Sequence, residues 1–250
     1  MDTTAASPTL VGARWLHEAT VVERLRAAGA VLLGKTTMTE WAAVWSNNAP
    51  DGYSQLYGQV HGAFSPDHNP GGSSAGAGVA ASLGLAAINI GTETDGSIIM
   101  PSDINGIVGI KPTPGLTSRF AVVPIQHTKD TIGPMTRWVK DAAFVLDIIA
   151  GKDAKDDLTS TIPHNPLPNY LSACDLDKVR GLRIGIYDAD IEKLERDHKE
   201  SLKLALLAAA TKMQELGATV VRGIDLATFR PRRGENKVVE YAMKADLKDG

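Results

Sequence analysis

The stretch Gly71-Gly72-Ser73-Ser74-Ala75-Gly76, with Gly91-Thr-Glu-Thr-Asp-Gly-Ser97 behind it, decides how this sequence is interpreted. The small residues of 75–85 predict a helix packed closely against a neighbour, and the apolar residues of 86–90 predict a buried strand. Because this helix and strand are short, the helix start and the strand end can meet at one end of a sheet. Helix starts and glycine turns present unpaired backbone N–H groups, which can bind a negatively charged oxygen.

The rest of the chain alternates between helix and strand patterns. The order strand, helix, strand within 182–222 implies parallel pairing. We therefore predict the α/β class, with a mixed, mostly parallel sheet covered by helices on both faces, in a single domain over residues 1–250. The expected segments are helices at 18–29, 139–150 and 198–216, strands at 30–33, 182–187 and 218–222, and loops at 45–72 and 152–180.

Within that domain, residues 1–150 form the core that carries the serines and 181–250 form a β-α-β continuation. With 43% hydrophobic and 22% charged residues, the 250-residue chain has the composition of a globular protein. Its net charge of −3 gives no electrostatic basis for binding nucleic acid or an anionic membrane.

The single cysteine, Cys174, excludes an internal disulfide and suits a reducing compartment. Neither a signal peptide nor a membrane-spanning stretch is recognisable in the sequence. No Cys/His cluster has the spacing of metal ligands. We therefore expect a cytoplasmic protein with no metal, no cofactor and no nucleic-acid or membrane partner.

Two other motifs suggest different functions. Residues 29–36, Gly-Ala-Val-Leu-Leu-Gly-Lys-Thr, match a phosphate-binding loop with Lys35 on the phosphates, but that loop follows a strand, whereas a helix is predicted before Gly29. Gly72–Gly76 matches the G-x-S-x-G nucleophile elbow with Ser74 as nucleophile, but the elbow also follows a strand, whereas 67–71 is typical of a loop. Both stay open as weaker alternatives.

Residues 70–119 resemble the signature of the amidase signature family, in GGSSAGAGVAASLGL and then GTETDGSIIMPSDINGIVGIKPTPGLTSR. Residues 18–42 are similar to the lead-in of that signature, and residues 129–151 are similar to its exit. The resemblance covers most of the chain, and the two glycine-serine motifs in this order are highly specific. It implies the amidase signature fold, present as a single partial amidase domain over residues 1–250. It also implies the hydrolysis of a small carboxylic amide to an acid and ammonia through an acyl-serine intermediate.

The resemblance also implies a role for each residue of the two motifs. Family members use a Ser-Ser-Lys triad, in which Ser97 corresponds to the nucleophile and Ser73 to the bridging serine, held through a cis peptide bond. The backbone N–H groups of Thr94, Asp95, Gly96 and Ser97 correspond to the oxyanion hole. Ser74 corresponds to a supporting residue that hydrogen-bonds within the site.

The sequence departs from the family at the lysine of the triad. That lysine belongs to a motif resembling G-x-P-x-x-x-K-D, which is absent from residues 1–34, and Lys35 matches a different family lysine with a structural role. The chain therefore looks truncated before the catalytic lysine and at its C-terminus, and we expect impaired hydrolysis. The alternative is an inactive amidase remnant that serves in binding or assembly, and a homodimer is left open.

Overall fold

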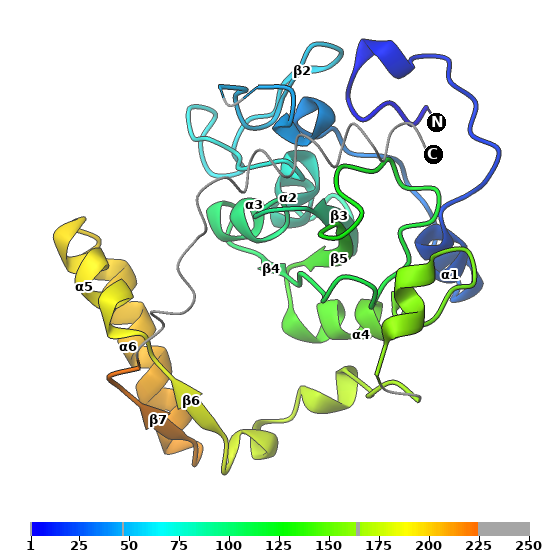
Figure 1. Cartoon of the computed structure of the whole chain (residues 1–250). Helices are drawn as coiled ribbons and strands as arrows, with labels where there is room; N and C mark the ends of the chain where they lie inside the picture. The colour runs from blue at the N-terminus through cyan, green and yellow to red at the C-terminus, as the bar shows by residue number, and fades with distance from the viewer. Residues whose placement is uncertain (1, 47, 164–165, 225–250) are drawn as a thin grey trace. The chain divides into compact units, whose positions relative to one another are not determined.

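The computed structural model describes residues 2–46, 48–163 and 166–224. The described chain forms two compact units, one that ends at Leu171 and one that begins at Ser172 (Figure 1). The boundary lies inside 152–180, the segment predicted as a loop. This segment contains neither an α-helix nor a longer strand among its described residues, but it does contain three short 3₁₀-helices, η3 (Asp157–Thr161), η4 (Leu171–Ala173) and η5 (Leu176–Val179).

The first unit is built on a three-stranded sheet. Its strands are β3 (Asn89–Glu93), β4 (Val108–Gly109) and β5 (Thr131–Thr136), in the order β3-β5-β4 with β5 in the middle. Both strand pairs are antiparallel, and β3 pairs with β5 along its whole length. This sheet carries the site described below, because the turn that ends in Ser97 follows directly from β3.

Helices cover both faces of this sheet, as the sequence predicts. One core cluster joins Ile132 of β5 to α1 (Thr20–Ala27) and α4 (Val139–Ile149), through Val21, Leu25, Val145, Leu146 and Ile149. A second cluster on the other face joins Met135 of β5 to Ile98 and to Ala77 of α2 (Ala75–Ser82). Figure 1 shows α4 and α2 on opposite sides of β5, with α3 (Ile99–Ile104) beside α2.

The α/β class is confirmed, but the predicted parallel pairing does not hold for this sheet. Parallel pairing occurs in the second unit, where β6 (Arg183–Gly185) pairs with β7 (Thr219–Val221). The parallel prediction rested on the β-α-β pattern of that unit. In the first unit the chain enters β5 from a long loop, without a crossover helix that would return it in the same direction.

Two predicted strands of the first unit differ from the structure. Residues 30–33 form no strand, and Val31 and Leu33 are 82% and 74% exposed. No described strand pairs with them, so their strand-forming side chains have no sheet to join. The strand predicted at 86–90 begins at Asn89 and runs on to Glu93, because pairing with β5 continues through Gly91 and Glu93.

The remaining elements of the first unit are short. They comprise η1 (Pro8–Leu10), η2 (Glu40–Ala43) and a hairpin of β1 (Tyr53–Ser54) with β2 (Gly58–Gln59). The hairpin lies within 45–72, which otherwise forms the predicted loop.

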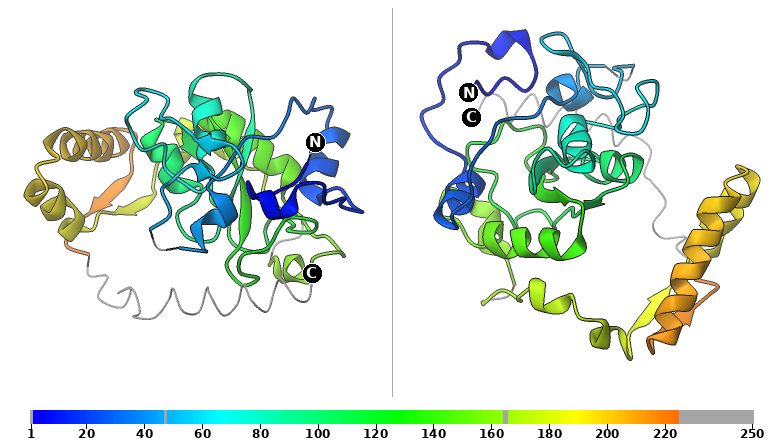
Figure 2. Two further views of the ribbon diagram at one scale, coloured as in Figure 1. Left: turned by 90° about the horizontal axis from the view of Figure 1, so that it is seen from above. Right: turned by 180° about the vertical axis from the view of Figure 1, so that it is seen from behind.

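The second unit contains one helix that the sequence pattern did not predict. Between β6 and β7 the chain forms α5 (Asp188–Arg196) and then α6 (Glu200–Glu215), which lie side by side (Figure 2). The helix predicted at 198–216 corresponds to α6. Across both units, the described residues include no helix with the length and apolar character needed to cross a lipid bilayer.

Gly133 of β5 offers a test of the sheet. A Cβ atom at this position would lie 1.9 Å from the Ile110 carbonyl oxygen, so the strand can pass that carbonyl only with glycine. We expect Gly133→Ala to lower the free energy of unfolding by about 3 kcal/mol, at the upper end of the usual cost of overpacking.

The measurement is urea unfolding of the full chain, with Gly12→Ala as the control. Gly12 has a φ of +80° and open space around it, so its methyl group meets only the conformational cost of about 1–2 kcal/mol. Equal losses in the two variants would contradict the proposed contact with Ile110.

Candidate active site

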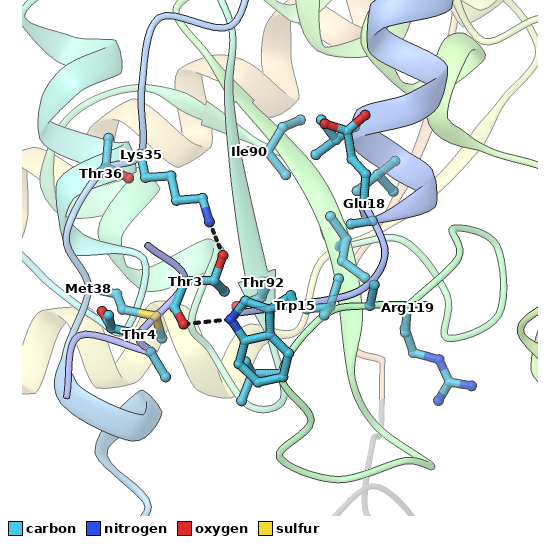
Figure 3. A pocket seen from close by; sticks show the side chains of 18 of the residues that line it. Thr3, Thr4, Trp15, Glu18, Lys35, Thr36, Met38, Ile90, Thr92 and Arg119 are labelled. Carbon is cyan, nitrogen blue, oxygen red and sulfur yellow. Dashed lines mark hydrogen bonds between the residues drawn. The ribbon is translucent and has the colours of Figure 1, made fainter. Parts of the chain in front are cut away.

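A cavity of about 2090 Å³ opens on the first unit and is lined by both serines of the expected pair, Ser73 and Ser97. Much of the remaining lining is apolar or aromatic, including Trp15, Trp41 and Phe120. Figure 3 shows the cavity from close by, with Ile90 and Thr92 of β3, Glu18, Lys35 and Arg119 around it.

The two glycine-serine stretches meet, as the sequence predicts. The Ser74 N–H donates to the Ser97 carbonyl oxygen at 3.2 Å. The Ser74 hydroxyl donates to the Thr92 carbonyl at 3.0 Å and accepts from the Thr92 N–H at 3.1 Å. Ser74 therefore ties the start of α2 to β3 at Thr92 and to the end of the following turn at Ser97. The expected supporting role of Ser74 in catalysis stays a prediction.

Close packing around the first stretch fixes Ser73. The peptide bond between Gly72 and Ser73 is cis, as the family resemblance implies. The Ser73 carbonyl accepts from the Thr39 N–H at 2.9 Å, and a Cβ atom on Gly72 would lie 2.5 Å from the Thr39 hydroxyl oxygen. The chain can therefore pass Thr39 at this distance only with glycine.

The side chain of Ser73 is buried, with 3% of its surface exposed, and its hydroxyl has no hydrogen-bond partner among the described residues. Ser97, 8% exposed, lines the same cavity, but the two hydroxyls are not hydrogen-bonded to each other. A buried hydroxyl without a partner costs free energy and therefore needs an explanation, and a catalytic role is one such explanation.

The turn from Thr94 to Ser97 is shaped by a buried carboxylate that the sequence analysis did not single out. Glu93 accepts from the Gly96 N–H at 2.9 Å, from the Ile98 N–H at 2.7 Å and from the Ile99 N–H at 3.0 Å. Its side chain is 5% exposed, and these charge-assisted hydrogen bonds satisfy it.

This arrangement changes the expected set of oxyanion donors. The Gly96 N–H already donates to Glu93, which removes it from the predicted set because a bonded donor is not available to a substrate oxygen. The N–H groups of Thr94, Asp95 and Ser97 have no acceptor among the described residues. Thr94 and Ser97 line the cavity, whereas Asp95 and Gly96 are not among its lining residues and the Asp95 side chain is exposed.

One cavity wall is held by two carboxylates. Asp130 accepts from the Thr94 hydroxyl at 2.5 Å. Burial raises the pKa of Asp130, although hydrogen bonds from Thr94 and from the Ile125 and Gln126 N–H groups act in the opposite direction. Asp156 forms a buried ion pair with Arg119 at 2.5 Å. Burial alone would raise the pKa of Asp156, but the bonds from Arg119 outweigh it and lower that pKa.

Lys35 reaches into the cavity but is bonded away from the serines. Its ammonium group donates to the Thr3 hydroxyl, and Figure 3 shows the two side chains pointing toward one another. Partial burial lowers the pKa of Lys35, against the charge of Asp2, which raises it. The segment 30–36 has neither a strand before Lys35 nor a helix directly after it, so the context of a phosphate-binding loop is missing.

The nucleophile-elbow alternative lacks its context as well. Residues 67–72 form turns and irregular structure rather than a strand, and the Ser74 hydroxyl is occupied by Thr92. Within the described ranges, no group of three or more His, Cys, Asp or Glu side chains could hold a metal ion.

The sequence matches the model of the Amidase family over residues 1–229. The chain belongs to the amidase family. It is 45% identical over 229 residues to a protein of Arthroderma benhamiae named "Putative amidase", an alignment that covers 92% of this chain and 38% of that protein.

Solved amidase structures share the fold. The peptide amidase from Stenotrophomonas maltophilia is 42% identical, with a TM-score of 0.89 over 100% of this chain and 50% of that chain. An amidase family protein from Bacillus anthracis is 30% identical, with a TM-score of 0.88 over 100% of this chain and 48% of that chain. This amidase chain thus spans about half the length of these solved structures. It spans 38% of the curated relative from Arthroderma benhamiae.

Glu93 can be tested as the residue that shapes the turn. In Glu93→Gln one carboxylate oxygen becomes an NH₂ group, which cannot accept from the backbone N–H groups. We expect the free energy of unfolding to fall by about 1–3 kcal/mol, the cost of leaving buried donors unpaired. Urea unfolding measures the change.

Asp95→Asn is the matched control, because it makes the same chemical change in the same turn on an exposed side chain. It should stay within about 0.5 kcal/mol of the unsubstituted chain. A loss in Asp95→Asn as large as that in Glu93→Gln would show that the turn is sensitive to any loss of charge.

Proposed function

We propose that this chain carries the nucleophile of an amidase that hydrolyses a carboxylic amide to an acid and ammonia through an acyl group on Ser97. The observation that carries the proposal is the hydrogen bond from the Ser74 N–H to the Ser97 carbonyl, because it brings both serine motifs to one cavity. The family match and the similarity to peptide amidase support it.

The chemistry proceeds in two halves. The Ser97 oxygen attacks the amide carbonyl carbon, and its proton passes through the Ser73 hydroxyl to the leaving nitrogen, which departs as ammonia. Water then attacks the acyl ester, releasing the acid and restoring the Ser97 hydroxyl. The free N–H groups of Thr94, Asp95 and Ser97 are the candidate donors to the oxyanion in both halves.

The cavity lining favours a substrate with an apolar acyl group. Trp15, Trp41, Phe120 and Val122 line it together with the serines, and small-molecule sites in proteins are typically apolar with a few placed polar groups. We propose a small amide with an aromatic or aliphatic side chain. Relatives named as glutamyl-tRNA(Gln) amidotransferase subunits are at most 40% identical, whereas the amidase-named relatives from Arthroderma benhamiae and Arabidopsis thaliana are 45% and 44% identical.

We further propose that the chain by itself hydrolyses amides slowly, since no lysine of the described residues reaches Ser73. Lys35 and Lys155 line the cavity, but their ammonium groups donate to Thr3 and Glu23. Without a base the Ser97 hydroxyl keeps the high pKa of an alcohol and is a poor nucleophile. The same observation favours a second candidate function, an inactive protein that serves in binding or assembly.

Covalent labelling tests the identity of the nucleophile. A fluorophosphonate probe phosphonylates the nucleophilic serine of a hydrolase site, and because Ser97 has no base among the described residues we expect its adduct to form slowly. Intact-protein mass spectrometry after long incubation should show one adduct, located at Ser97 by peptide mapping. Ser97→Ala should abolish the adduct, and Ser160→Ala, which removes an exposed hydroxyl from the same unit, should leave it unchanged. An adduct at Ser74 would instead support the nucleophile elbow.

Turnover tests whether catalysis is impaired. With phenylalaninamide as substrate and ammonia release as the measurement, we expect a kcat at least about 100-fold below that of the Stenotrophomonas peptide amidase assayed in parallel, because general-base help contributes about 10²–10⁴-fold. A kcat equal to that of the comparison enzyme, abolished by Ser97→Ala, would refute the impairment. Labelling of Ser97 without any turnover would favour the second candidate.

A further inference from the structure

The carboxylate of Asp130 fastens the turn that carries the nucleophile to the segment 125–130, which also contributes to the cavity lining. One oxygen, Oδ1, accepts from the Thr94 hydroxyl at 2.5 Å. The other, Oδ2, accepts from the Ile125 N–H at 2.7 Å and the Gln126 N–H at 2.9 Å. Both oxygens are therefore engaged, and Thr94 is bound to a group that the chain between residues 125 and 130 already holds in place.

The register of the sheet brings these residues together. Glu93 lies opposite Thr131 in the pairing of β3 with β5, so the residue after Glu93 adjoins the residue before Thr131. Thr94 and Asp130 are 36 positions apart in sequence, yet both line the cavity beside Ser97. Their contact lies at the end of two paired strands, which is a rigid place from which to hold a turn.

The contact acts on one of the free backbone donors. The Thr94 N–H has no acceptor among the described residues, and Thr94 is the first residue of the turn. A threonine whose hydroxyl is fixed has little freedom to rotate its peptide plane. Donors to an oxyanion stabilise it best when they are oriented before the charge develops.

We infer that Asp130 is a positioning residue which, through the Thr94 hydroxyl, orients the backbone donors beside Ser97 for the oxyanion. The inference deepens the proposed function and rests on it. Charge-assisted hydrogen bonds of this kind are roughly twice as strong as neutral ones, which suits a fastening role. If the contact were merely structural, its loss would destabilise the fold and would weaken the binding of a transition-state mimic and of a substrate to the same extent.

The experiment compares the binding of two probes to the full chain. Phenylalaninamide represents the ground state, and the trifluoromethyl ketone analogue of phenylalanine represents the oxyanion, because a serine adds to it to form an ionised hemiketal. We expect Asp130→Asn and Thr94→Val each to weaken binding of the trifluoromethyl ketone at least about 10-fold, since one oxyanion donor is worth about 10²–10³-fold when removed outright. The dissociation constant of phenylalaninamide should change less than about two-fold, as expected for an interaction realised only in the transition state.

Two further variants separate positioning from a general loss of structure. Thr94→Ser keeps the hydroxyl and should bind both probes like the unsubstituted chain. Asp153→Asn is the matched control, because Asp153 also accepts from two hydroxyls, those of Thr20 and Ser118, but does not line the cavity. If Asp130→Asn does not fold, the comparison of Thr94→Val with Thr94→Ser tests the positioning role instead.

Equal weakening for both probes, or none for either, in a folded Thr94→Val variant would overturn the inference. The double variant Asp130→Asn/Thr94→Val should lose no more affinity than the larger single loss, and additive losses would also contradict a shared role. Failure of the proposed function has a different signature. In that case the unsubstituted chain forms neither the fluorophosphonate adduct nor the hemiketal at Ser97.

Discussion

The hydrogen bond between the Ser74 N–H and the Ser97 carbonyl joins the two glycine-serine stretches, each of which contributes a serine to the lining of the same cavity. The Ser74 hydroxyl strengthens this junction, because it bridges the N–H and carbonyl of Thr92 at the end of β3. A helix start and a strand end are thus joined without any large side chain. This explains the small residues at the junction, where a Cβ on Gly91 would lie 2.9 Å from the Ser74 hydroxyl oxygen.

Glu93 adds a second constraint with a chemical consequence. Burying a carboxylate is unfavourable unless its oxygens are hydrogen-bonded, so Glu93 requires the three N–H groups that it accepts from. These bonds fold the turn around the Glu93 carboxylate and leave the N–H groups of Thr94, Asp95 and Ser97 without an acceptor among the described residues. The carboxylate that shapes the turn therefore also decides which amides stay available for a substrate oxygen. Its role was missed in the sequence because only the folded turn shows which N–H groups the carboxylate faces.

The sequence predicts the parts of this site that depend on neighbouring residues. The meeting of Ser74 with Ser97 follows from two local motifs and from the short helix and strand between them. The central strand β5 does not follow, because Gly133 and the proline after it interrupt its strand pattern, and this glycine is explained only by the distant carbonyl of Ile110. Conversely, residues 30–33 have the composition of a buried strand and form none, because strand formation needs a partner that composition cannot supply.

The antiparallel register of β3 with β5 connects all of these features. It places Glu93 opposite Thr131 and thereby brings two carboxylates to the same end of the strand pair. Glu93 shapes the turn, and Asp130, which directly precedes β5, fastens the first residue of that turn. The 36 positions between Thr94 and Asp130 conceal this contact in the sequence. A shift of one residue in β5 would turn Ile132 away from the cluster of α1 and α4 on one face of the sheet, and it would separate Thr94 from Asp130. The apolar packing on that face therefore protects the geometry beside Ser97, although none of its side chains belongs to the turn.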